Sequence, residues 1–263
     1  MKIICFILFY FSLFAVTAQE RIKVDYSEYK HVQIPILQKG QLYIDLKNEK
    51  TVWVENTSSR IENYDKKNIE KPKNEDIRRP DNSFEVSLGR TIPDDYVLYD
   101  YKNRKIEIIE DLGKKVFSVP DTFNELKWNL QKETKTVNNI ECFKATTNFR
   151  GNDWDVWYAP SIPYPYGPWK LHGLPGLILE AKTKDGFYTL IADKIEYNYP
   201  ENNQLVPRDK ILKELSFKEY LEYQDVLFNM LFLGEDMPKQ ARDIFAHKKE
   251  RKFETKANLS WMK

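Results

Sequence analysis

The sequence predicts a mainly β (α+β) fold, in which a curved antiparallel β-meander or open barrel is followed by one or two C-terminal helices. Two observations support the sheet. Short runs that alternate apolar and polar residues recur along the chain with turn residues between them. Aromatic residues make up 14% of the chain and glycines number only nine, a balance that favours half-buried strands. Beyond about residue 216 the apolar spacing becomes helical, which is the third observation.

In the first part of the chain, alternation is found at 22–26, 42–46 and 51–54, and residues 48–50 form the turn of a hairpin. A second hairpin is expected within 95–110. A short strand at 116–119 should end at Pro120, because proline lacks the N–H that a sheet ladder needs. Residues 56–82 are charged and polar with few apolar side chains, so we expect a solvated loop there.

Further strands are expected at 126–130, 140–149, 154–158, 177–183 and 187–195, the last two joined by a turn at 184–186. Between 159 and 172, four prolines alternate with aromatic residues, which predicts an extended or polyproline-like connection.

The C-terminal part predicts helices. Ser216 and Glu219 have the spacing of a capping box at the start of a helix that runs to about residue 232, and Gly234 suits its end. A second helix is expected at 237–249. We therefore expect a single β-rich domain over 19–263, with a helical part from about 216.

A tight turn is expected at the sequence Leu174-Pro175-Gly176-Leu177. Proline fixes φ at the second position of a type II turn, and Gly176 can adopt the positive φ of the third position. The missing Cβ at Gly173 and Gly176 also permits close approach by another chain segment or a ligand.

Residues 173–178 read Gly-Leu-Pro-Gly-Leu-Ile, and related features occur upstream at 140–145, 150–151, 154, 157–160, 162–163 and 167–168. This pattern closely resembles the GLPGLI family and covers residues 140–182, about a sixth of the chain. The resemblance implies a Gram-negative envelope protein with a signal peptide, without an established activity and without known catalytic residues. The motif residues are Gly167, Pro168, Gly173, Leu174, Pro175, Gly176, Leu177 and Ile178.

The N-terminus has the features of a signal peptide over residues 1–18: Lys2, a nearly unbroken apolar run at 3–14, and small residues at 16–18. The run is shorter than the roughly 20 residues that span a bilayer. We therefore predict export across the inner membrane, to the periplasm or the extracellular space, with no transmembrane segment in the mature chain. Without Lys2 the chain carries 40 basic and 40 acidic residues, which argues against a nucleic-acid partner.

Catalytic and metal-binding patterns are sparse. The three histidines, at 31, 172 and 247, form no metal-spaced pair, and no phosphate loop or dinucleotide fingerprint occurs, so no metal and no cofactor are predicted. Cys142 and His172 could form a thiol nucleophile and its base, although Cys142 lies in a predicted strand, where a buried inert thiol is expected. Asp153 and Asp155 share one face of a predicted strand. They could act as general acid and general base, or they could simply form part of a solvated surface.

Aromatic residues are dense near the motif, and Trp154 and Trp157 should point to opposite faces of one strand. The aromatic residues near the motif either line a pocket or fill the core. The candidate ligand-binding residues are Trp157, Tyr158, Tyr164, Tyr166, Trp169, His172 and Leu174. The expected function is non-enzymatic binding of an apolar ligand, a peptide or a partner protein. The alternatives are a periplasmic hydrolase that uses His172 and a structural subunit of an outer-membrane assembly, with an outer-membrane protein as partner.

Overall fold

A computed structural model describes residues 20–31, 36–62, 90–200, 202 and 204–232. The described chain forms one twelve-stranded sheet, one 3₁₀ turn (η1, Arg208–Lys210) and one C-terminal helix (α1, Phe217–Phe232). The strands are β1 (Arg21–Lys30), β2 (Ile36–Asp45), β3 (Lys50–Glu62), β4 (Asp95–Asp100), β5 (Lys105–Asp111), β6 (Val116–Asp121), β7 (Asn129–Val137), β8 (Ile140–Phe149), β9 (Asn152–Ala159), β10 (Leu177–Thr183), β11 (Tyr188–Tyr197) and β12 (Ile211–Glu214). The predicted fold class is confirmed.

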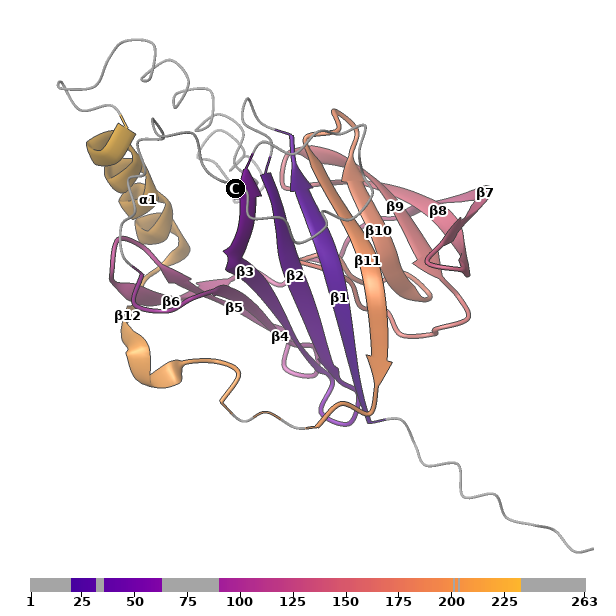
Figure 1. Ribbon diagram of the computed structural model, residues 1–263, viewed down its shortest axis with the longest axis horizontal. Helices are drawn as coiled ribbons and strands as arrows, with labels where there is room; N and C mark the ends of the chain where they lie inside the picture. Colours follow the sequence, from indigo (N-terminus) through magenta and orange to yellow (C-terminus); the bar gives the residue numbers. More distant parts are fainter. Residues whose placement is uncertain (1–19, 32–35, 63–89, 201, 203, 233–263) are drawn as a thin grey trace, which may run out of the picture.

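The sheet consists of two antiparallel meanders that meet at its centre (Figure 1). Its strand order is β12-β6-β5-β4-β3-β2-β1-β11-β10-β9-β8-β7. The meanders join where β1 pairs antiparallel with β11, and β12 adds a parallel strand beside β6. Since β12 and β7 stand at opposite ends of this order, the sheet is open within the described residues.

Several local predictions are confirmed by backbone geometry. Asn138 and Asn139 both adopt positive φ, 49° and 62°, as the two-residue turn between β7 and β8 requires. At the start of α1, the backbone N–H of Ser216 donates to Glu219 Oε2 (2.8 Å), and the Glu219 N–H donates to Ser216 Oγ (3.3 Å). This is the predicted capping box.

Other boundaries differ from the predictions. The strand β3 continues to residue 62, so the first part of the expected loop at 56–82 is paired with β2, and the rest lies outside the described residues. The strand β6 includes Pro120, which is tolerated because β12 pairs only with 116–118 and needs no donor at 120. Residues 126–128 precede β7 instead of forming it, and β12 was not predicted. The signal peptide, Gly234 and the second helix at 237–249 fall outside the described residues.

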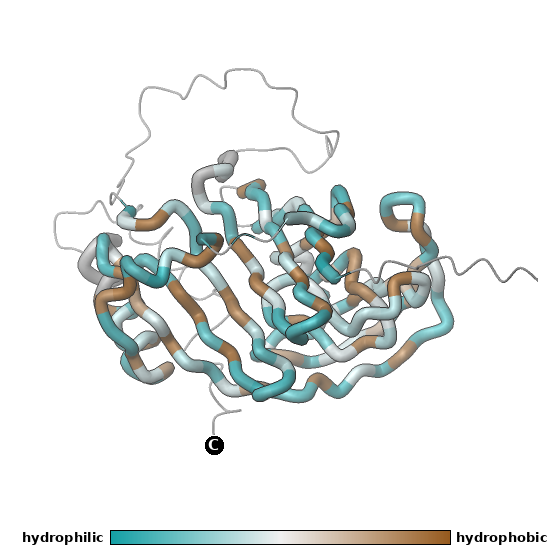
Figure 2. Tube along the Cα trace, turned by 90° about the horizontal axis from the view of Figure 1, so that it is seen from below, coloured by the Kyte–Doolittle hydropathy of each residue, from teal (hydrophilic) through white to brown (hydrophobic). Residues whose placement is uncertain are grey.

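The sheet is strongly curved (Figure 2), and its inner face is the face that packs against residues 160–176. This proline-rich segment is folded into turns and is not the extended connection that was predicted. The Leu177 N–H donates to Ile162 O (2.9 Å), and the Ile178 N–H donates to Tyr166 O (3.0 Å). Its apolar side chains are buried: Ile162, Tyr166, Trp169, Leu171 and Leu174. The segment therefore supplies the core with the side chains that fill the curved sheet.

The motif turn also has a different geometry from the predicted type II turn. Gly176 does not have positive φ; its N–H donates to Leu174 O (2.8 Å), which closes a three-residue γ-turn at Pro175. The positive φ belongs to Gly173, at 90°. Gly176 is needed for space, since a Cβ there would lie 2.3 Å from the Ala159 carbonyl oxygen. The expected close approach of another segment is thus found at Gly176.

Helix α1 covers the inner face at one end of the sheet, where Phe217, Tyr220 and Leu221 pack against side chains of β5 and β6. On the outer face, apolar side chains of β3–β6 pack against Leu205, Val206 and Ile211. The sheet is therefore covered on both faces at this end, and the inner-face cover combines the 160–176 segment with α1.

Candidate functional site

A cavity of about 220 Å³ lies on the inner face, between the sheet, the 160–176 segment and α1. Strands β3, β4, β5 and β11 form its floor and sides, residues 169–170 form a wall, and α1 contributes Tyr220 and Gln224. Its lining residues are Trp53, Glu55, Asp95, Tyr96, Val97, Ile108, Glu110, Trp169, Lys170, Tyr188, Tyr220 and Gln224. Aromatic rings and carboxylates thus share one cavity.

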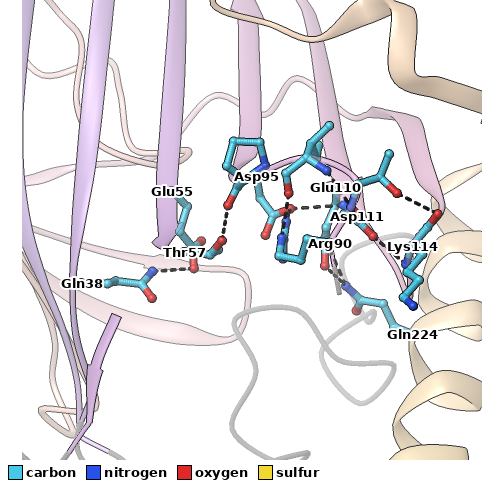
Figure 3. Close-up of polar contacts among 12 residues, drawn as sticks. Gln38, Glu55, Thr57, Arg90, Asp95, Glu110, Asp111, Lys114 and Gln224 are labelled. Atoms are coloured by element: carbon cyan, nitrogen blue, oxygen red, sulfur yellow. Dashed lines mark hydrogen bonds and ion pairs between the residues drawn. The ribbon is translucent and has the colours of Figure 1, made fainter. Parts of the chain in front are cut away.

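The carboxylates belong to a row of polar side chains that crosses adjacent strands of the inner face. This polar row consists of Glu28 (β1), Gln38 (β2), Glu55 (β3), Asp95 (β4) and Glu110 (β5). Gln38 Nε2 donates to Glu55 Oε1 (2.6 Å, Figure 3) and to Glu28 Oε2 (2.7 Å), so the amide bridges two carboxylates. Glu55 stands opposite Asp95 in the register of β3 and β4.

Charged and polar neighbours hold the row in place. Lys30 Nζ lies 2.6 Å from Glu55 Oε1 and 3.3 Å from Glu28 Oε1. Arg90 donates to Asp95, and Glu110 accepts a hydrogen bond from the Gln224 amide (Figure 3). The Tyr220 hydroxyl also donates to Glu110. The α1 helix is therefore fastened to the sheet at the cavity itself.

Burial and crowding of carboxylates raise the pKa of two members of the row. Burial raises the pKa of Asp95 well above its ordinary value, and the neighbouring Glu110 adds to the shift. Burial also raises the pKa of Glu28 to about 7, with Glu55 adding to the shift. The row therefore holds carboxyl groups that take up a proton more readily than exposed Asp or Glu side chains do.

A buried ionic cluster supports the cavity wall. Asp121 from β6 accepts hydrogen bonds from Arg150 Nη2 (2.9 and 3.0 Å) and from Lys170 Nζ (2.7 Å), and all three side chains are 1% exposed. Arg150 and Lys170 also stand over the Phe217 ring at 5.5 and 5.6 Å. This cluster connects the two meanders, the 160–176 segment and the start of α1.

The structure does not bring the seven candidate ligand-binding residues into one site. Trp169 lines the cavity and holds an unusual left-handed backbone, φ 53°. Trp157 lies on the outer face, half-buried beneath Lys135 Nζ at 4.5 Å, and Trp154 is buried on the inner face, as their spacing predicts. The remaining five lie in or beside the core away from the cavity: Tyr158, Tyr164, Tyr166, His172 and Leu174.

The proposed thiol–imidazole pair is poorly placed for chemistry. His172 packs among Tyr99, Tyr101 and Phe123, and burial lowers its pKa to about 4. Cys142 is buried in β8, where burial raises its pKa to about 11, so the thiol is protonated at neutral pH. Asp153 and Asp155 lie on the outer face, beside Asn148 and Lys144 respectively. Neither pair lines the cavity.

Sequence reasoning missed the polar row, although a signal is visible. On three of the five strands, an apolar residue of the inner face is followed by a carboxylate two positions later: Tyr26 by Glu28, Trp53 by Glu55, and Ile108 by Glu110. Read singly, each pair resembles an ordinary strand end. Only the sheet register places the carboxylates side by side.

Comparison with known proteins gives one family-model match and several similar folds. The model described as N-glycanase peptide, N-terminal domain matches residues 95–225. No curated protein matches the chain. A structure of PNGF-II in space group C2 is similar at 17% identity, with a TM-score of 0.50, over 80% of this chain and 33% of that chain. A second structure of PNGF-II, in space group P21, matches at 16% identity with a TM-score of 0.49, over 80% and 34%.

A LolA superfamily protein from Nitrosomonas europaea matches at 9% identity with a TM-score of 0.31, over 73% of this chain and 92% of that chain. The PNGF-II likeness shows a shared fold, and this chain spans about a third of PNGF-II.

Two further features of the described residues bear on the site. They contain no cluster of three or more His, Cys, Asp or Glu side chains placed to hold a metal ion. Within the same residues, no helix has the length and apolar character needed to cross a membrane.

Proposed function

We propose that this chain is a non-enzymatic binding module of an exported protein, and that its ligand is a glycan-bearing peptide held in the inner-face cavity. The observation that carries the proposal is the cavity itself, which combines aromatic rings with a row of hydrogen-bonding carboxylates. Such a mixture of apolar surface and a few polar groups is typical of small-molecule sites. The match to an N-glycanase N-terminal domain supports a glycan-bearing ligand.

Export is part of the same proposal. The signal-peptide pattern at 1–18 and the resemblance to the GLPGLI family both support a location in the envelope or outside the cell. The mixed lining of the cavity favours a polar ligand over the purely apolar ligand considered from the sequence. The hydrolase alternative receives no support from His172 or Cys142. Burial lowers the pKa of His172 to about 4, which makes the imidazole a weak base, and burial keeps the Cys142 thiol protonated at neutral pH.

Isothermal titration calorimetry tests the proposal with three probes: a peptide carrying one asparagine-linked glycan, the same peptide without glycan, and the free glycan. We expect binding of the glycopeptide and no loss of its glycan, checked by mass spectrometry after incubation. Glu110→Ala should weaken binding about tenfold or more, since it removes a charged acceptor from the cavity. Glu107→Ala is the matched control on the same strand, because Glu107 lies on the opposite face.

Absence of binding by all three probes would reject the proposal. Release of the glycan would favour the enzyme alternative. A membrane protein that copurifies with the chain, together with no probe binding, would instead support the structural-subunit alternative.

A further inference from the structure

The inner-face cavity is small for a glycan-bearing peptide. Its volume of about 220 Å³ is below the roughly 300–1,000 Å³ of pockets that enclose a whole drug-sized molecule. A glycan-bearing peptide is larger still, so only one of its groups can enter the cavity and the rest must lie outside. Which group enters depends on the chemistry of the side chains that stay open to the cavity.

Carboxylates are the most accessible groups of the cavity lining. The Glu55 side chain is 26% exposed and the Asp95 side chain is 21% exposed, whereas the aromatic residues of the lining are only 2–8% exposed. Lys170 also belongs to the lining, but its ammonium group donates to Asp121 and the side chain is 1% exposed. An entering group therefore meets hydrogen-bond acceptors with negative charge before it meets any aromatic face.

The carboxylates of the lining act on one another. Asp95 stands opposite Glu55 in the pairing of β3 with β4, and like charges in such positions repel. Burial raises the pKa of Asp95 well above its ordinary value; of the neighbouring charges Glu110 adds most to this shift and Glu55 adds further, while Arg90 opposes it. A cation that entered among the three carboxylates would replace repulsion by attraction, which an uncharged hydroxyl group cannot do.

The rest of the lining suits the stem of a long basic side chain. Val97, Ile108 and Trp169 add apolar surface beside the carboxylates. Lysine and arginine side chains pack their methylene stems against such surface while the charged head reaches polar partners. The guanidinium group of arginine is planar and carries five donors, so it can bind more than one carboxylate at once.

We propose that the cavity binds the guanidinium group of an arginine in the peptide part of the ligand, with Glu55, Asp95 and Glu110 as its acceptors. This inference rests on the proposed function and assigns the peptide, not the glycan, to the cavity. The three acceptors come from the adjacent strands β3, β4 and β5 and all belong to the lining. The polar row thus selects peptides that carry an arginine near the glycosylated asparagine.

Isothermal titration calorimetry of the wild-type protein with two matched glycopeptides tests the charge of the ligand. One glycopeptide has an arginine on each side of the glycosylated asparagine, and the other has citrulline at the same positions, which keeps the shape of arginine and removes its charge. The citrulline glycopeptide should bind about tenfold or more weaker, because it loses charged hydrogen bonds. Added salt should weaken the arginine glycopeptide more than the citrulline glycopeptide.

Protein variants test which carboxylates are the acceptors. Asp95→Asn and Glu110→Gln keep the size of each side chain and remove its charge, so each should reduce the preference for arginine over citrulline. Glu107→Gln is the matched control, since Glu107 lies on the opposite face of β5, and should keep the wild-type preference. The comparison of the two glycopeptides on the unaltered protein stands even if a variant folds poorly.

Equal affinity of the wild-type protein for the arginine and citrulline glycopeptides would overturn the inference and leave the proposed function standing. Binding of the free glycan as tight as that of the arginine glycopeptide would also overturn it, because the glycan would then supply the contacts. The same holds if folded Asp95→Asn and Glu110→Gln both keep the wild-type preference. Failure of the wild-type protein to bind any probe would reject both proposals.

Discussion

Replacing Asp121 by asparagine should destabilise the protein strongly, because this carboxylate is the shared acceptor of the buried ionic cluster. Its three hydrogen bonds, at 2.7, 2.9 and 3.0 Å, connect it to Lys170 and Arg150, and all three side chains are 1% exposed. Removing one partner from a buried ion pair costs about 3–5 kcal/mol. For a domain of this size each kcal/mol lowers Tm by about 2–4 °C, so the expected loss is roughly 6–20 °C.

The loss of stability caused by Asp121→Asn should depend on pH, and the direction of the change follows from the pKa of Asp121. Although burial opposes the shift, Lys170 and Arg150 hold the pKa of Asp121 below its ordinary value. A lowered folded-state pKa means that the stabilisation is complete above the ordinary value of about 4 and disappears as pH falls through the folded pKa. The difference in Tm between wild type and Asp121→Asn should therefore be constant near neutral pH and shrink in stronger acid.

Differential scanning calorimetry at several pH values measures both effects. Asp153→Asn is the matched control, because Asp153 is exposed and its loss should change stability by about 0.5 kcal/mol or less. An Asp121→Asn protein that melts within about 2 °C of the wild type at pH 7 would refute the reasoning, since about 3 kcal/mol lost from a buried pair cannot leave Tm nearly unchanged.

Two further predictions concern residues 142 and 176. Gly176→Ala should cost about 3 kcal/mol or more in urea unfolding, because its Cβ would lie 2.3 Å from a backbone oxygen of Ala159 that cannot rotate away. In Gly186→Ala the Cβ meets only the Lys182 side chain at 3.6 Å, and the cost comes from the positive φ of 74° instead; a loss in Gly176→Ala no larger than this would contradict the reasoning. Cys142 should resist iodoacetamide at pH 8 and react once urea unfolds the protein, since burial raises its pKa to about 11; rapid alkylation of the native protein, seen by mass spectrometry, would show that the thiol is accessible.

Local sequence signals predicted the sheet well where short-range chemistry sets the structure. The Asn138–Asn139 turn and the Ser216–Glu219 capping box were both predicted, since each depends on residues within one turn of the chain. The γ-turn at Pro175 was not predicted. Both turn types accept a Leu-Pro-Gly sequence, so these residues alone do not decide between them.

In the candidate site, too, some features were predicted from the sequence and others depend on contacts between distant segments. The sequence drew attention to the aromatic residues near the motif, and of these Trp169 does line the cavity. His172 and Leu174 belong to the buried core, because the 160–176 segment folds back into the curved sheet instead of extending across its surface. Proline and aromatic composition is compatible with either arrangement.

The sequence by itself determined the mainly β class, the meander of hairpins and the start of the C-terminal helix, because strand alternation, turn chemistry and capping act between near neighbours. Tertiary structure alone decided that Glu55, Asp95 and Glu110 line one cavity with Trp53 and Trp169. That cavity depends on the register of adjacent strands and on the curvature of the sheet, which brings Asp121 next to Arg150. It also depends on the 160–176 segment, which packs against the inner face and forms one wall of the cavity. These are long-range contacts, and no short stretch of sequence specifies them.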